Sequence, residues 1–268
     1  MKKNFDKVVV ITGASSGIGY QVAKNLASKG AKVYNISRRP MEDTIFQKSF
    51  ACDVNETEKV DMALNEIYNK EGKIDVFMNN AGFGIAGAIE NAKPESIYSL
   101  VNTNLSAVIA LSGVAVKYLK MSGGGNIINT CSVGGIIPLP YQATYSATKA
   151  GVDVFSRALA NEVKQFKIKV TTILPGDMKT GFTKARIIEN DAKDDSYKKS
   201  VEKSIKKAEK EEINGQNPEI VGKIVYKILK KKNPPLRKTI GFSYKLIVFL
   251  PRIFPIKFVN WLVRKIYI

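Results

Sequence analysis

The stretch Thr12-Gly13-Ala14-Ser15-Ser16-Gly17-Ile18-Gly19 stands between two segments of opposite character. Residues 7–11 before it form a short apolar run with β-branched side chains, which is typical of a buried parallel strand. Residues 20–29 after it carry apolar side chains at helical spacing and end at Gly30, which predicts an amphipathic helix. The glycines permit a tight turn and let the backbone approach a pyrophosphate, which the free N–H groups of the helix can bind. The stretch therefore predicts a dinucleotide-binding loop.

The same alternation of strand and helix continues along the 268-residue chain. Apolar runs predict further strands at residues 32–36, 74–78, 126–130 and 169–174. Helical periodicity predicts helices at residues 56–70, 94–119, 145–166 and 218–232. Strands separated by helices are typical of an α/β fold in which helices cover both faces of a parallel sheet. The length and the 44% hydrophobic content suit a single domain, residues 1–268, with a helical C-terminal extension.

Ligands of such sheets bind beyond the carboxyl ends of the strands. The loops that follow predicted strands are therefore expected to build the site, and they span residues 12–19, 37–40, 79–82, 131–135 and 175–180. Residues 180–218 are rich in Lys and Glu and poor in core side chains, so we expect a helical excursion that serves as a substrate lid. A solvated surface helix is the alternative for this segment.

The chain contains no histidine, and this excludes two large classes of enzyme. A Ser-His-Asp hydrolase needs an imidazole base, and an HExxH metalloenzyme needs imidazole ligands. The match of residues 13–17 to the G-x-S-x-G nucleophile elbow is therefore treated as a coincidence. Cys52 and Cys131 are too few for a multi-disulfide framework or a four-thiolate zinc site, so no metal is expected and a reducing setting is the default.

The formal net charge of +18 is concentrated near the C-terminus. Residues 220–268 hold twelve Lys or Arg residues and no Asp or Glu. A basic and apolar tail suits a membrane surface at least as well as a nucleic acid, and the chain carries no nucleic-acid-binding signature, so no nucleic acid is expected as a partner. Three alternatives stay open for residues 234–268: peripheral membrane contact, packing on the domain, and a composition bias without a partner.

The sequence predicts neither a signal peptide nor a membrane span. The apolar run at residues 8–11 is too short for the core of a signal peptide. We also find no stretch that reaches the roughly 18 uncharged apolar residues of a spanning helix. The expected location is therefore cytoplasmic, with membrane association only through the tail.

The end of the second predicted strand favours one dinucleotide over the other. An NAD site is expected to place an acidic residue there, where it binds the ribose hydroxyls. This chain has Ser37 instead, followed by Arg38 and Arg39. Guanidinium groups bind a 2′-phosphate in a bidentate manner, whereas a carboxylate would repel it. The sequence therefore favours NADP(H) as the cofactor.

Tyr145 and Lys149 stand four residues apart, on one face of a predicted helix. A nearby ammonium group and the positive nicotinamide of an oxidised cofactor favour the phenolate, which would lower the tyrosine pKa from its ordinary value of about 10. Tyr145 could then act as a general acid or base near neutral pH. Ser132 lies at a predicted strand end, where its hydroxyl could bind a substrate oxygen, and Asn104 lies in a predicted helix of the preceding unit.

In order and spacing, these motifs resemble the pattern of the short-chain dehydrogenase/reductase superfamily over most of residues 7–240. The resemblance rests on residues 12–19, Asp53-Val54, Asn79-Asn80-Ala81-Gly82, Asn104, Ser132, Tyr145, Lys149, Pro175-Gly176 and Thr180. It implies a Rossmann-type doubly wound sheet and a catalytic tetrad of Asn104, Ser132, Tyr145 and Lys149. By this resemblance Ser132 orients the substrate oxygen, Tyr145 transfers the proton, and Asn104 anchors a water in a proton relay.

The resemblance also implies how the cofactor is held. Lys149 would lower the tyrosine pKa and hold the nicotinamide ribose, Asp53 would contact the adenine, and Thr180 would face the carboxamide. Asn80 would support the central strand beside the cofactor. The expected cofactor-binding residues are Gly13, Ser15, Ser16, Gly17, Ile18, Gly19, Arg38, Arg39, Asp53, Val54, Asn80, Ala81, Gly82, Tyr145, Lys149, Pro175, Gly176 and Thr180. Cys131 stands where many members have a second serine.

The function implied is an NADP(H)-dependent oxidoreductase that transfers a hydride between the nicotinamide and a carbonyl or secondary alcohol, in a homodimer or homotetramer. The basic, apolar tail extends past the family's usual end and is similar to tails of members that act on lipophilic substrates such as steroids, retinoids or fatty ketones. The alternative is a non-catalytic NADP(H)-binding sensor or scaffold protein at a membrane surface. Inactive members usually lose the Tyr or the Lys, whereas this chain keeps Tyr145 and Lys149.

Overall fold

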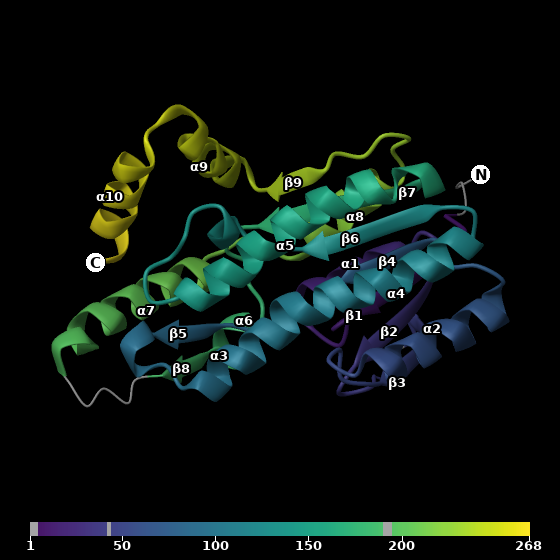
Figure 1. Ribbon diagram of the computed structural model, residues 1–268, viewed down its shortest axis with the longest axis horizontal. Helices are drawn as coiled ribbons and strands as arrows, with labels where there is room; N and C mark the ends of the chain where they lie inside the picture. The colour runs from purple at the N-terminus through teal and green to yellow at the C-terminus, as the bar shows by residue number, and fades with distance from the viewer. Residues whose placement is uncertain (1–4, 42–43, 190–194) are drawn as a thin grey trace.

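The structure, a computed structural model, describes residues 5–41, 44–189 and 195–268. Within these residues, a seven-stranded sheet with the strand order β3-β2-β1-β4-β6-β7-β9 runs through the molecule (Figure 1). All of its neighbouring strands are parallel, which confirms the predicted Rossmann-type sheet. The strands are β1 (Val8–Thr12), β2 (Lys32–Ser37), β3 (Phe46–Ala51), β4 (Val76–Asn79), β6 (Gly125–Thr130), β7 (Ile168–Pro175) and β9 (Arg237–Ile240).

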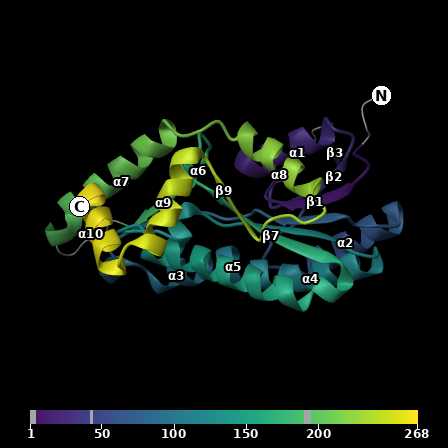
Figure 2. The same ribbon diagram turned by 90° about the horizontal axis from the view of Figure 1, so that it is seen from above.

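Helices cover both faces of the sheet (Figure 2). The alternating side chains of β1 explain this arrangement: Val8 and Val10 pack into the core beneath α2, α4 and α5, and Val9 and Ile11 pack into the core beneath α1 and α8. The helices are α1 (Gly17–Ala27), α2 (Thr57–Glu71), α3 (Pro94–Val101), α4 (Ala107–Met121), α5 (Ala143–Glu162), α6 (Phe182–Ala185), α7 (Lys198–Ile213), α8 (Glu219–Leu229), α9 (Phe242–Ile253) and α10 (Ile256–Tyr267).

Four short strands were not predicted from the sequence. β3 and β9 form the two edges of the main sheet, and β5 (Ile85–Gly87) pairs in parallel with β8 (Ile187–Glu189) in a separate two-stranded sheet. The helical excursion predicted for residues 180–218 contains α6 and α7, with the unpredicted strand β8 between them, and its use as a substrate lid stays a prediction; its residues 190–194 lie outside the described part of the chain. The segment also contributes core residues, since Val201 and Ile205 of α7 are buried against Ala86 and Ala88.

A π-helical turn, Asn102–Ser106, joins α3 and α4 into one helix from Pro94 to Met121. In the described part of the chain, this helix alone has the length and hydropathy of a membrane span, which the sequence analysis did not anticipate. It packs against β4 and β6, with α2 and α5 beside it. Part of its apolar surface, including Leu100, Leu111 and Leu119, is buried in the domain core.

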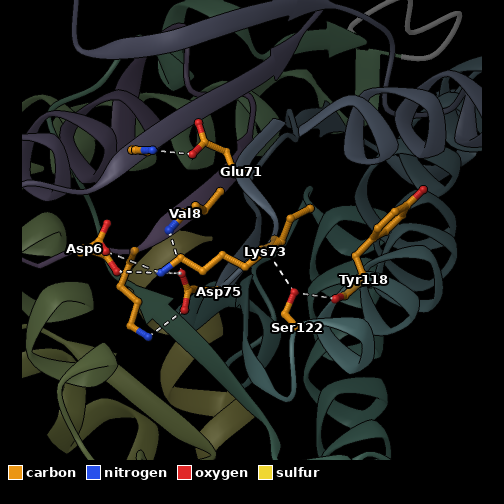
Figure 3. A network of polar contacts seen from close by, with 10 residues as sticks. Asp6, Val8, Glu71, Lys73, Asp75, Tyr118 and Ser122 are labelled. Carbon is orange, nitrogen blue, oxygen red and sulfur yellow. Dashed lines mark hydrogen bonds and ion pairs between the residues drawn. The ribbon is translucent and has the colours of Figure 1, made fainter. Parts of the chain in front are cut away.

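A network of ion pairs and hydrogen bonds lies at the amino ends of the strands (Figure 3). Asp75, just before β4, accepts a hydrogen bond from the backbone N–H of Val8 at 2.9 Å and forms ion pairs with Lys7 at 2.7 Å and Lys73 at 3.3 Å. Ser122, at the end of α4, accepts a hydrogen bond from the backbone N–H of Ile74 at 2.9 Å. These contacts tie β1, β4 and the end of α4 together, far from the loops that were expected to build the site.

The C-terminal helices α9 and α10 lie at the opposite end, where the strands have their carboxyl ends (Figure 1). Val248 of α9 is buried in a cluster with Leu174 at the end of β7. Val259 and Val263 of α10 are buried against Ile137. The tail therefore packs on the domain, and it does so directly over the loops that follow the strands.

Candidate active site

The glycine loop adopts a conformation that larger residues would strain. Gly13 and Gly17 have φ values of +67° and +57°, in the left-handed region that favours glycine. A Cβ atom on Gly13 would lie 2.9 Å from the Cα of Ala81, and one on Gly19 would collide with the side chain of Asn80. The glycines therefore let the loop pack directly against the segment that follows β4.

The two segments are also joined by hydrogen bonds. The side chain of Thr12 accepts hydrogen bonds from the backbone N–H groups of Asn80 and Ala81, at 2.9 and 3.1 Å. The amide group of Asn80 donates to the carbonyl oxygens of Thr12 and Gly13, at 3.1 and 3.2 Å. Asn80 thus holds the end of β1 in place.

The start of α1 fits a phosphate group. The Ser16 side chain makes no capping hydrogen bond at this helix, and its first turn contains no acidic residue. The backbone N–H groups and the positive end of the helix dipole can therefore serve a bound anion. The residues present fit the pyrophosphate of a dinucleotide.

A cavity of about 1260 Å³ extends from this loop to Tyr145 and on to the tail helices. Nearly all of the predicted cofactor-binding residues line it: Gly13, Ser15, Ser16, Gly17, Ile18, Arg38, Arg39, Asp53, Val54, Asn80, Ala81, Gly82, Tyr145, Lys149, Pro175, Gly176 and Thr180. Gly19 lies buried beneath the loop, where the close approach to Asn80 explains why it is a glycine.

Three of the four predicted catalytic residues line the same cavity, namely Ser132, Tyr145 and Lys149. Ser132 follows β6, and its hydroxyl oxygen accepts a hydrogen bond from the backbone N–H of Gly134 at 3.0 Å. Tyr145 and Lys149 lie one turn apart on α5, and the Lys149 ammonium is 5.8 Å from the centre of the tyrosine ring. The Lys149 Nζ atom donates to the carbonyl oxygen of Thr130 at 3.0 Å, which fixes its position.

The pKa of Tyr145 differs from the sequence expectation. Burial raises the pKa of this phenol above its ordinary value, and a side-chain hydrogen bond with Ser132 opposes the rise only in part. Burial also lowers the pKa of Lys149. The lowered tyrosine pKa that helix spacing suggested is not found, because spacing indicates the neighbouring ammonium but not the depth of burial. Tyr145 is accordingly a protonated phenol at neutral pH.

Asn104 does not line the cavity but lies just behind its wall. It is fully buried in the π-helical turn, where its amide group donates to the carbonyl oxygen of Phe83 at 2.8 Å and accepts from the Phe83 N–H at 3.1 Å. A Cβ atom on Gly82 would lie 2.9 Å from the Asn104 oxygen and 3.6 Å from Lys149 Nζ. Asn104 thus supports the loop that passes Lys149, and its role in a water relay stays a prediction.

Cys131, the residue before Ser132, is buried and has no disulfide partner. Its thiol donates to the carbonyl oxygen of Lys149 at 2.9 Å. Burial raises the pKa of the thiol to about 11. Cys131 is therefore a neutral hydrogen-bond donor that ties β6 to α5, a task that a serine hydroxyl could also perform.

The tail contributes site residues that the sequence analysis missed. The ring of Tyr244, from α9, lies directly on Gly176, where any side chain would collide with it. Its hydroxyl donates to Asp177 at 2.6 Å. Tyr267, from α10, donates to Glu211 of α7 at 2.9 Å. No local motif signals these contacts, since the first joins residues 67 positions apart and the second 56.

Three carboxyl groups gather on the cavity wall beside the tail: Asp177, Glu211 and Glu212. Burial raises the pKa of Asp177, and the charges of Glu211 and Glu212 raise it further, although the hydrogen bond from Tyr244 opposes them. Glu212 accepts hydrogen bonds from Thr183 and Arg186, which come from α6 and the residue after it. Glu211 is also paired with Lys207 at 2.9 Å, so this wall presents carboxyl groups of which two have basic partners.

A chain of contacts links this wall to Tyr145. The Arg186 side chain is almost completely buried, and its guanidinium carbon lies 5.7 Å from the centre of the Phe182 ring. The Phe182 ring in turn lies 5.8 Å from the Tyr145 ring, tilted by 57°. Phe182 thus covers the phenol, and residues 180–189 form one wall of the cavity around the reacting group.

The sequence matches the family model for short chain dehydrogenases over residues 7–191. The chain belongs to the short-chain dehydrogenase family. Enzymes of this family are oxidoreductases that use a nicotinamide cofactor, and the cavity described above fits this chemistry. The match covers the glycine loop and Ser132, Tyr145 and Lys149, whereas α7 to α10 lie beyond it.

Several relatives of this short-chain dehydrogenase are named as reductases. The chain is 41% identical over 236 residues to a 3-ketodihydrosphingosine reductase from Bacteroides thetaiotaomicron, with 88% of each chain covered. It is 34% identical over 186 residues to a 3-oxoacyl-(acyl-carrier-protein) reductase from Vibrio cholerae, which covers 67% of this chain and 76% of the relative.

Among solved structures, a short-chain dehydrogenase from Streptomyces avermitilis superposes with a TM-score of 0.81 at 23% identity. It covers 98% of this chain and 96% of that one. The two chains therefore share the same overall fold.

Proposed function

We propose that this short-chain dehydrogenase is an NADPH-dependent reductase of a ketone in a lipophilic substrate. The observation that carries the proposal is the placement of Ser132, Tyr145 and Lys149 in one cavity with the glycine loop. Reduction of a ketone consumes a proton, and the protonated Tyr145 phenol in this cavity can donate one.

The arrangement at the end of β2 supports NADP(H) as the cofactor. Arg38 and Arg39 are exposed at the cavity rim, and the buried Ser37 hydroxyl donates to the carbonyl oxygen of Arg39 at 2.7 Å. This hydrogen bond fixes the turn that carries both guanidinium groups. A 2′-phosphate on the adenosine ribose would be attracted by these groups and would meet no acidic residue at the strand end.

The hydride for the reduction would come from the nicotinamide of the bound cofactor. The Ser132 hydroxyl would donate a hydrogen bond to the substrate carbonyl oxygen and so hold it against Tyr145. As negative charge develops on this oxygen, the Tyr145 phenol would transfer its proton to it, which completes the alcohol. The Lys149 ammonium would stabilise the resulting phenolate until solvent returns a proton.

The lining of the cavity supports the proposal of a substrate with a long alkyl chain and a cationic group. Apolar side chains of the tail line one part of it, namely Ile247, Leu250, Val259, Leu262, Val263 and Ile266. Asp177, Glu211 and Glu212 line the wall beside them. A 3-ketosphingoid base, the substrate class in the name of the Bacteroides relative, combines a ketone, an adjacent primary amine and a long alkyl chain. We propose an amino ketone of this kind as the substrate.

The test compares three ketones in an NADPH-oxidation assay. They are a long-chain 2-amino-3-ketone, the same ketone without the amine, and a 3-oxoacyl thioester. We expect kcat/KM to be at least about tenfold higher for the amino ketone, since a charge-assisted hydrogen bond is worth about 1.5–3 kcal/mol. Asp177→Asn together with Glu211→Gln should remove this preference and leave the rate on the amine-free ketone unchanged.

Equal rates on the first two ketones would contradict an amine-selective site but leave the reductase intact. Tight binding of NADPH without oxidation by any of the three would contradict the reductase, and it would favour the alternative of a nucleotide-binding sensor.

A further inference from the structure

The helix α9 carries an apolar stripe that no other described part of the chain covers. Phe242, Leu246, Phe249 and Ile253 follow one another at i, i+4, i+7 and i+11, so they share one side of the helix. They are between 48% and 76% exposed. The opposite side of α9 faces the domain through Val248, which is buried. The helix is therefore apolar on both sides, and only one of them is used by the fold.

An aromatic cluster continues this exposed surface onto α10. The ring centres of Phe254 and Phe258 lie 5.1 Å apart, and those of Phe258 and Trp261 lie 5.8 Å apart in a stacked arrangement. All three side chains are more than 40% exposed. Exposed apolar residues are common on proteins as single side chains, but contiguous groups of this kind mark interaction sites.

Basic side chains accompany the apolar ones. On these two helices they are Lys245, Arg252, Lys257, Arg264 and Lys265, all exposed. Residues 220–268 contain no acidic residue. We call these five basic residues and the seven apolar ones described above the tail surface. Trp and Phe beside Lys and Arg on amphipathic helices are typical of proteins that lie at the membrane–water interface.

We propose that the tail surface docks on a bilayer that contains anionic lipids. The apolar side chains would enter the boundary between headgroups and acyl chains, and the basic side chains would pair with lipid phosphates. A second copy of this chain is a poorer occupant. A symmetric dimer through this surface would bring five cations of one subunit toward five of the other, with no acidic residue of residues 220–268 to pair with them.

The tail surface lies on the same two helices that line the cavity, so docking would bring the cavity close to the bilayer. The same two helices line the cavity with Leu250, Val259 and Val263 and carry the tail surface on their outer sides. A lipid molecule would therefore have to travel only past α9 and α10 to pass from the bilayer to Tyr145. The docking itself does not rest on the proposed reductase activity, and it is measured without turnover.

Trp261 offers a direct probe, because it is the only tryptophan in the chain and it is 53% exposed. The full chain is titrated with vesicles of phosphatidylcholine containing about one third phosphatidylglycerol, and with vesicles of phosphatidylcholine alone. We expect a blue shift of the emission and quenching by lipids brominated in their acyl chains, with at least about tenfold tighter binding to the anionic vesicles at low salt.

Two variants test the surface itself. Leu246→Glu together with Phe249→Glu places charges in the apolar stripe of α9 while Trp261 remains, and it should weaken vesicle binding at least about tenfold. Met62→Glu is the matched control, since Met62 is 72% exposed on α2 and lies outside the tail surface. It should bind vesicles like the unaltered chain. Both variants are first checked for an unchanged unfolding temperature.

The absence of a spectral shift up to millimolar anionic lipid would overturn the proposal. So would equal weakening by the control, which would show that any added negative charge is enough. A dimer in lipid-free solution that the double variant converts to a monomer would show instead that the tail surface is covered by a second copy.

Discussion

The two ends of the parallel sheet differ in whether a charged side chain has an oppositely charged partner. At the amino ends, Asp75 is satisfied by two lysines and a backbone N–H group (Figure 3). At the carboxyl ends, Lys149 is buried with a carbonyl oxygen as its hydrogen-bond acceptor, and burial lowers its pKa. A paired charge stabilises the fold, whereas a buried charge without an opposite charge costs stability. The comparison indicates that one end maintains the sheet and the other is kept for chemistry.

The largest effect is expected at Tyr145. Tyr145→Phe removes the proton donor but keeps the ring that packs on Phe182, so kcat should fall about a thousandfold. NADPH affinity, measured by cofactor fluorescence, should stay within about threefold, because the other residues that line the cofactor part of the cavity are unchanged. Turnover at the normal rate in this variant would remove Tyr145 from the mechanism.

The sharpest test of the comparison is Lys149→Met. Turnover should fall at least about a hundredfold, since the phenolate loses its neighbouring cation. The unfolding temperature should nevertheless rise at pH 7. Because burial lowers the pKa of Lys149 in the folded chain, the unfolded chain binds the proton more strongly, and the cost of the buried ammonium is fully present at pH values below the folded-state pKa.

This cost decreases as the pH rises above the pKa of Lys149 in the folded state toward the ordinary lysine value of 10.5. The gain in unfolding temperature for Lys149→Met should therefore be smaller at pH 9.5 than at pH 7. If Lys149→Met unfolds at a lower temperature than the unaltered chain at both pH values, the buried Lys149 does not lower stability, which would contradict the comparison.

The amino end should give the opposite result. Asp75→Ala leaves the Val8 N–H without its acceptor and Lys7 without its ion-pair partner, while Lys73 keeps Asp6, so the free energy of unfolding should fall by about 2 kcal/mol. The lysines are partly exposed, which limits their share of this loss. Urea unfolding measures the change, and Asp75→Asn, which keeps an acceptor oxygen, should lose less. A loss of kcat beyond about twofold in either variant would contradict the view that the amino ends of the strands contribute to stability and not to catalysis.

The smallest effect is expected at an exposed charge of the carboxyl end. Arg38→Asp should lower kcat/KM for NADPH relative to NADH about tenfold, the value of one charge-assisted hydrogen bond, without changing the unfolding temperature. Arg39→Asp serves as the companion variant on the other guanidinium group. An unchanged preference in both variants would contradict the cofactor assignment.

Features that lie within one element could be predicted from the sequence. The glycine loop joins adjacent elements, and Tyr145 and Lys149 are one helical turn apart, so spacing alone predicts their geometry. The order of loops after the strands then brings Ser132 to the same end of the sheet. For this reason the residues that line the cofactor part of the cavity, and most of the parallel sheet, followed from the sequence.

Contacts between distant residues could not be predicted in this way. β5 and β8 have only three residues each and pair across about a hundred positions, so neither carries a periodicity that marks it as a strand. The contact of Tyr244 with Asp177 depends on where α9 comes to rest. The direction of the Tyr145 pKa shift depends on burial, and the sequence indicated only the charge beside it.

The π-helical turn Asn102–Ser106 amounts to the insertion of one residue into a helix. Its hydrogen bonds reach one residue further than those of an α-helix, and each residue of an α-helix adds a rotation of about 100°. Deletion of a single residue here would let the helix from Pro94 to Met121 close into a regular α-helix and rotate its first part against its second. Leu100 would leave its cluster with Tyr145, or Asn104 would leave Phe83. The number of residues in this helix is therefore as much a part of the active site as their identity.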